Sequence, residues 1–392
     1  MKKSLTISAT ILLVMAGCGE SRPAGELITV DVTAAGYPKK ELILQDFMDV
    51  EYIPLETTDE FITQGFVQDV GKDIIVVRNR VSDGDIFIFD RKTGKALKKI
   101  NRKGQGGEEY TNILIVTLDE DNGEMFVNDL YIRKILVYDM DGNFKRSFEH
   151  KEGAMYDHHL YNFDRDNLIC HDSFYSGDGV GNMQPFMIIS KQDGSITRDI
   201  QIPFEERILT VLRKKDEASN MTYSVKPSTD YPIIPCEGGW IIVEPSSDTI
   251  YRYSPDHSMT PILVRTPPVR SMDPEVFLFL SLLTDRYYFM ETIKKIWDFE
   301  RQEGLTSKYL MYDRQEKAIY EYTVYNDDYS TKKQVYMNRP STEEVATWQI
   351  LEAPQLVGAY GKGELKGRLA EIAAGLDEES NPVIMLLKHK KK

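Results

Sequence analysis

The sequence of 392 residues lacks the motifs that identify the commonest enzyme classes. It contains no His-Glu-x-x-His, Gly-x-Ser-x-Gly, P-loop or Cys-x-x-Cys motif, so the usual zinc, serine-hydrolase and nucleotide signatures are missing. Positive charge is also scarce, with 48 Lys and Arg against 62 Asp and Glu and a net charge of -14. Because nucleic-acid binding needs a basic surface to neutralise phosphates, we expect no nucleic-acid partner.

The first eighteen residues have the three parts of an export signal. Lys2 and Lys3 precede a short apolar run, Ile11–Met15, and the sequence Met15-Ala16-Gly17-Cys18 brings small residues up to a cysteine. The apolar run is too short to span a bilayer. The segment resembles a bacterial lipoprotein signal, which implies cleavage before Cys18 and acylation of that residue. The alternative is an ordinary secretory signal with a chance cysteine.

This N-terminus predicts where the protein resides. We expect a signal peptide over residues 1–17, a polar tether over 18–25 and a single domain over 26–392. Acyl chains on Cys18 would hold the protein to the cell envelope, at the outer membrane, with membrane contact through the lipid only. The sequence leaves undecided whether the protein lies on the periplasmic face or on the outer face of that membrane. The remaining cysteines, Cys170 and Cys236, could form one bridge, but each ends an apolar run, which favours two buried thiols.

One β-hairpin pattern recurs along the rest of the chain. The runs Ile86–Asp90 and Ala96–Ile100 flank a turn that contains Gly94. Two more strand-like runs precede each hairpin, and these units begin at Phe66, Ile113, His159, Tyr231 and Phe277. The interval is about 46 residues, except where the polar stretch Arg213–Asn220 predicts a loop or a small excursion. A four-stranded unit of this length repeated in series is typical of a β-propeller.

The C-terminal region predicts a sixth blade. Val345–Leu351, Leu356–Tyr360 and Pro382–Leu387 are expected to be strands, and apolar residues at helical spacing within Gly363–Gly375 predict a short helix. The N-terminal runs Leu27–Val32 and Val50–Leu55 have no blade of their own. We therefore expect an all-β, six-bladed propeller with four-stranded antiparallel blades, a short helix in the last blade, and a ring closed by pairing N- and C-terminal strands.

Three motifs together resemble a known family. Tyr52–Thr57, the loop Gly104–Tyr110 and the closing Glu379–Val383 are similar to segments of the six-bladed β-propeller lipoproteins of Gram-negative gut anaerobes. Members usually have Pro and Gly where this chain has Gly107 and Glu108. The resemblance implies a propeller fold and an envelope location, and no general reaction is established for the family.

Few side chains are candidates for a site. His159 and His171 fall on adjacent predicted strands and could share a ligand; His158 would face the other way, since neighbouring strand residues alternate. Ordinary rim histidines are the competing interpretation, and we predict no metal and no cofactor. Tyr175, in a long glycine-rich loop, and Arg286 with Tyr287, near a turn, are candidates for ligand contacts. Packing between blades is the alternative role for these aromatics.

Three functions fit this architecture. The first is a non-catalytic binding or scaffolding propeller for a glycan, a peptide or a partner protein, held at the envelope by its lipid. The second is a glycan- or lactone-directed hydrolase or lyase with its site at the propeller axis; residues gathered from distant blades leave no local motif. The third is a structural component of an outer-membrane assembly. The sequence favours the first.

Overall fold

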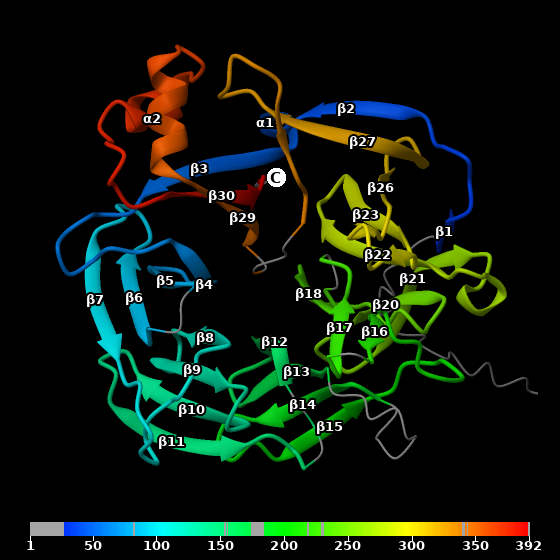
Figure 1. Ribbon diagram of the computed structural model, residues 1–392, viewed down its shortest axis with the longest axis horizontal. Coiled ribbons are helices and arrows are strands. Elements are labelled where there is room, and N and C mark those ends of the chain that lie inside the picture. The colour runs from blue at the N-terminus through cyan, green and yellow to red at the C-terminus, as the bar shows by residue number, and fades with distance from the viewer. Residues whose placement is uncertain are drawn as a thin grey trace, which may run out of the picture.

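A computed structural model describes residues 27–80, 83–152, 154, 156–173, 184–217, 219–228, 231–338, 342 and 344–390, apart from the side chains of 157 and 158. The predicted signal peptide, tether, Cys18 and Tyr175 lie outside these residues. Within them, six sheets surround a central axis like the blades of a propeller (Figure 1). The predicted six-bladed β-propeller is confirmed.

The first three blades are four-stranded antiparallel sheets in which the chain runs from the axis outward. Blade 1 contains β4 (Phe66–Val70), β5 (Ile74–Arg78), β6 (Asp85–Asp90) and β7 (Ala96–Asn101). Blade 2 contains β8 (Ile115–Asp119), β9 (Glu124–Asp129), β10 (Lys134–Asp139) and β11 (Phe144–Glu149). Blade 3 contains β12 (Tyr156–Asn162), β13 (Asn167–Asp172), β14 (Phe186–Ser190) and β15 (Ile196–Ile200).

Blades 4 and 5 each gain an outer parallel strand from the N-terminal region. Blade 4 contains β18 (Ile233–Cys236), β19 (Gly239–Ile242), β20 (Thr249–Tyr253) and β21 (Met259–Thr266), followed by β1 (Ile28–Asp31). Blade 5 contains β22 (Val276–Leu283), β23 (Tyr287–Lys294), β26 (Ser307–Asp313) and β27 (Ala318–Asn326), followed by β2 (Lys39–Ile43), with the short β28 (Lys333–Val335) also paired to β27. These additions pair with edges that would otherwise be exposed.

Blade 6 closes the ring through a strand from each end of the chain. Its three strands are β29 (Val345–Leu351), β30 (Val383–His389) and β3 (Met48–Pro54), and β3 pairs with β30 along its full length. This is the predicted closure. The turn between β6 and β7 of blade 1 meets the end of β3 closely: Gly94 has φ +70°, and a Cβ there would lie 1.9 Å from the Pro54 carbonyl oxygen.

One strand predicted in this blade is a helix. Leu356–Tyr360 lies in α2 (Ala353–Gly361), which has Pro354 in its first turn and buries Ala353 and Leu356, three residues apart. That spacing belongs to a helical face, and proline is compatible with the first helical turn. The predicted helix within Gly363–Gly375 is confirmed as α3 (Gly367–Ala373).

Two short hairpins and two helical turns complete the described part of the chain. The stretch Arg213–Asn220 belongs to a separate hairpin of β16 (Leu212–Asp216) and β17 (Met221–Val225). A second short hairpin pairs β24 (Trp297–Asp298) with β25 (Glu303–Gly304). The others are the helical turns α1 (Leu44–Phe47) and η1 (Val269–Ser271).

Most of the apolar core lies between neighbouring blades. One cluster joins Val76 and Ile88 of blade 1 to Val116 and Met125 of blade 2. Cys170 and Cys236 are buried thiols in two different clusters, which confirms the interpretation that they do not pair. Packing of this kind fixes each blade against the next and so positions the inner strands around the axis.

Candidate functional site

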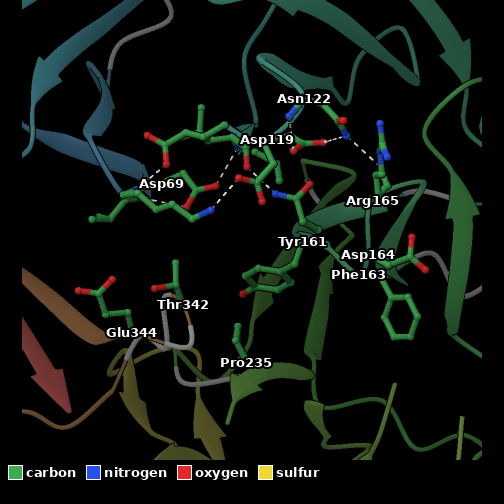
Figure 2. A pocket seen from close by; sticks show the side chains of 18 of the residues that line it. Asp69, Asp119, Asn122, Tyr161, Phe163, Asp164, Arg165, Pro235, Thr342 and Glu344 are labelled. Carbon is green, nitrogen blue, oxygen red and sulfur yellow. Dashed lines mark hydrogen bonds and ion pairs between the residues drawn. The ribbon is translucent and has the colours of Figure 1, made fainter. Parts of the chain in front are cut away.

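A cavity of about 820 Å³ opens at one end of the propeller axis. It lies where the inner strands of blades 1 to 4 end and turn outward, and Thr342 and Glu344, just before β29, complete its wall. Figure 2 shows Asp69 and Asp119 on one side of it, Pro235 on the other, and Tyr161 between them. Its lining therefore comes from residues spread over most of the chain.

Side chains of neighbouring blades bond to the free edge of an inner strand. Among the described strands β8 pairs with β9 alone, and its other edge faces the axis. The Val116 N–H donates to Gln68 Oε1 at 3.3 Å, and the Leu118 N–H donates to Asp69 Oδ2 at 2.8 Å. On the same residue, the Leu118 carbonyl accepts a hydrogen bond from Asn162 Nδ2. These bonds satisfy buried backbone groups and place Asp69 and Asn162 beside one another.

Asp69 has the perturbed acidity expected of a functional carboxyl group. Burial in the cavity wall raises its pKa to about 6, and the nearby Glu120 carboxylate acts in the same direction. Hydrogen bonds from the backbone N–H groups of Leu118 and Val70 oppose this rise. Raised carboxyl pKa values cluster at functional sites, because desolvation and like charge both favour the neutral acid.

Most of the basic side chains around the cavity form ion pairs with carboxylates and hydrogen bonds with backbone carbonyls. Lys191 Nζ is 2.7 Å from Asp119 Oδ2 and also donates to the carbonyl of Asp164 at 2.8 Å. Arg91 donates to the Gly71 carbonyl at 2.8 Å and pairs with Glu344 at 3.3 Å. These side chains hold the turns at the cavity mouth together.

The repeat explains where these cations come from. Arg91, Lys191 and Arg314 each follow the third strand of a blade, and each backbone N–H bonds to the carbonyl of the turn between the first two strands. Aligning the repeats at this position is the sequence signal that would have identified Arg91 and Lys191.

Aromatic side chains form a second part of the cavity lining. The rings of Tyr161 and Trp240 have centroids 5.6 Å apart, and the Phe163 and Trp240 rings are stacked at 6.5 Å. Phe163 also stacks on His257 of blade 4 at 5.7 Å. The wall thus spans blades 3 and 4 and presents apolar faces to the same cavity that Asp69 lines.

The predicted histidine pair lies together but outside this cavity. The rings of His159 and His171 have centroids 6.3 Å apart, with Tyr231 and Phe186 packed against them. Neither histidine lines the axial cavity. Within the part of the chain that the structure describes, no group of three or more His, Cys, Asp and Glu side chains has the arrangement of a metal site.

Arg286 and Tyr287 lie in blade 5, away from the cavity. Arg286 is 2.9 Å from the buried Asp313, which Lys40 also contacts at 3.0 Å. These bonds hold the pKa of Asp313 at about 2 despite its burial. Tyr287 is buried and packs edge-on against Phe47 at 5.2 Å. Neither Arg286 nor Tyr287 lines the axial cavity, and a role of these two residues in ligand contact remains a prediction.

Solved structures with a similar arrangement come from several bacteria. A Bacteroides fragilis protein described as exported has a TM-score of 0.56 and 14% identity over 90% of this chain and 99% of its own. A member of the DUF4221 family from Bacteroides vulgatus scores 0.40 at 9% identity, covering 88% and 98%. Virginiamycin B lyase from Staphylococcus aureus scores 0.37 at 12%, covering 88% and 100%. The first similarity supports the fold and says nothing of a ligand.

Sequence comparison identifies the family. No curated protein matches the chain. None of the helices in the described ranges is long and apolar enough to cross a membrane. The model of the family described as "Domain of unknown function (DUF4934)" matches residues 27–388, which is most of the sequence. The chain therefore belongs to the DUF4934 family.

Proposed function

We propose that this protein is an envelope-anchored binding propeller whose axial cavity holds a small glycan. The observation that carries the proposal is the pairing, within one cavity, of an aromatic wall with a hydrogen-bonding wall. Trp240 and Tyr161 form the first, and Asp69 and Asn162 form the second. Sugars have the same two-sided character, with apolar C–H faces and polar hydroxyl edges.

The dimensions of the cavity support a ligand of this size. Ligand pockets commonly measure about 300–1,000 Å³ and combine apolar walls with a few placed polar groups. At about 820 Å³, the cavity fits that range. Aromatic rings supply a flat contact surface, while carboxylate and amide oxygens accept hydrogen bonds from hydroxyl groups.

The anchoring part of the proposal rests on the N-terminal sequence. The Lys2-Lys3 start, the short apolar run and Cys18 have the order of a lipoprotein signal. Export is also the description given to the Bacteroides fragilis protein that shares the fold. A lipid-held propeller would present its cavity to the surrounding solvent without any membrane-spanning segment.

A glycan-array screen of the purified full-length protein, followed by calorimetry on the strongest ligand, tests the binding function. Trp240→Ala should weaken that ligand at least tenfold, which is about 1.4 kcal/mol, because it removes the largest ring of the aromatic wall. Trp297→Ala is the matched control, since Trp297 is also partly buried but lies on β24, away from the cavity. No bound glycan, or equal affinity of Trp240→Ala and parent, would refute the proposal.

Asp69 supports a second candidate, a hydrolase or lyase acting on a glycan or lactone at the same place. A carboxyl group with a pKa of about 6 can exchange protons near neutral pH, as a general acid or base must. Incubation of the ligand with the parent protein and with Asp69→Asn tests this. Product formed by the parent and abolished in the variant would establish catalysis, and an unchanged ligand would restrict the protein to binding.

A further inference from the structure

We propose that the cavity recognises a ligand with a free ammonium group, namely an unacetylated amino sugar, and that Asp69 and Asn162 hold this group together. The inference rests on the proposed binding function and names the ligand class for the same site.

Both side chains are positioned by one residue. The N–H and C=O of a strand residue point to the same edge, and at Leu118 that edge faces the axis, away from β9. Asp69 accepts the N–H at 2.8 Å, and the amide of Asn162 binds the C=O. Asp69 and Asn162 come from blades 1 and 3, so they approach Leu118 from opposite sides and converge on one spot of the cavity wall.

Asn162 has an acceptor that the protein does not use. Its Nδ2 is committed to the Leu118 carbonyl, while Oδ1 is buried and has no hydrogen-bond partner among the described residues. Buried polar atoms are nearly always bonded, so an unused one in a cavity wall calls for a donor from outside the protein. An ammonium group has three donors and no acceptor, which matches the carboxylate of Asp69 and the oxygen of Asn162.

The charges around the cavity favour a cation over an anion. Its lining contains four basic side chains, of which Lys191, Arg91 and Lys72 are paired with Asp119, Glu344 and Asp121. The fourth, Arg165, is exposed and stands at the rim beyond Asn122 (Figure 2). Among the described residues no basic side chain pairs with Asp69, so a negatively charged ligand would meet an uncompensated carboxylate next to an acceptor oxygen.

The test compares three oligosaccharides with the full-length protein at pH 7 by calorimetry: tetraglucosamine, its fully N-acetylated form, and tetragalacturonate. Tetraglucosamine should bind at least tenfold more tightly than the acetylated form, and tetragalacturonate should bind weakest. Asp69→Asn should remove the preference for the amine. Asp121→Asn, which changes a carboxylate at the exposed part of the same lining, should keep it. Thermal unfolding of both variants checks that they are folded. The comparison of tetraglucosamine with its N-acetylated form uses the parent protein, so it does not depend on the folding of any variant.

The outcomes separate this inference from the function on which it rests. Equal affinity for the two glucosamine forms, or an amine preference that survives Asp69→Asn, would overturn the ammonium site and leave a glycan-binding cavity intact. Tighter binding of tetragalacturonate would overturn it in the same way. Failure of every oligosaccharide here, together with an empty glycan array, would overturn both.

Discussion

Substitution of Lys191 by methionine should strongly destabilise the propeller. The side chains of Lys191 and Asp119 are 3% and 6% exposed, and their charged atoms are 2.7 Å apart. Methionine keeps the length of the side chain and removes its charge. Asp119 would then be buried with an uncompensated carboxylate. Among the described residues, Asn122 would still donate to this carboxylate, through its side chain at 2.8 Å and its backbone N–H at 3.2 Å.

The expected magnitude follows from burial. Breaking a buried ion pair by removing one partner costs about 3–5 kcal/mol, because the remaining charge is left desolvated. Asn122 retains part of the hydrogen bonding to Asp119. We therefore expect Lys191→Met to lower the free energy of unfolding by about 3 kcal/mol, the lower end of that range. The Asp164 carbonyl, 2.8 Å from Lys191 Nζ, also loses a donor.

Lys72 provides a matched control in the same lining. It pairs with Asp121 at 2.6 Å, but the two side chains are 69% and 79% exposed. Exposed pairs gain little because water already solvates both charges. Lys72→Met should therefore unfold at the same urea concentration as the parent.

Urea unfolding, followed by tryptophan fluorescence, measures these differences from the midpoints at an unchanged slope. Combining Lys191→Met with Asp119→Asn should recover more than half of the loss, since no buried charge then remains. Equal midpoints for Lys191→Met and Lys72→Met would refute the reasoning, as would a double variant no more stable than Lys191→Met.

Four further results are expected. Deleting residues 382–392 removes β30, whose five buried apolar side chains each contribute roughly 1.5–3 kcal/mol, so the truncated protein should aggregate or melt far below the parent; an unchanged melting temperature would contradict the closure. Cys18→Ser should leave the protein uncleaved or released from the membrane fraction, as fractionation and mass spectrometry will show. Changing His159 and His171 together to alanine should shift melting by only a few degrees, and a chelator should not affect the parent; bound metal that is lost with these side chains would argue otherwise. Burial lowers the pKa of His150 to about 4, so only the unfolded chain gains a proton between pH 6.5 and 4, and stability should fall by about 3 kcal/mol across that window. His150→Gln should lack this pH-dependent fall.

The blade architecture could be read from local patterns because a propeller repeats one local unit. Each third strand is followed by a turn with its own chemistry: Asp90 accepts hydrogen bonds from the N–H groups of Lys92 and Thr93, and Asp139 does the same two and four residues on. Such contacts span a few residues, so the sequence specifies them directly. Helix α2 was misread as a strand because its short apolar run was too brief to distinguish the two periods.

The candidate site depended on contacts that no local pattern contains. Asp69, Leu118 and Asn162 are separated by more than forty residues at each step, and only the ring brings blades 1 to 3 around one axis. His159 and His171 could be predicted to be neighbours because they lie on adjacent strands of one blade. That both lie outside the axial cavity could not be predicted from the sequence. The sequence by itself determined most of the blade strands and their turns, because these follow from short-range alternation, and it predicted that an N-terminal strand closes the ring beside β30. Only the structure showed that this strand is β3, while β1 joins blade 4. Only the tertiary structure decided which side chains face the axis and which cations are neutralised, because both result from packing between blades.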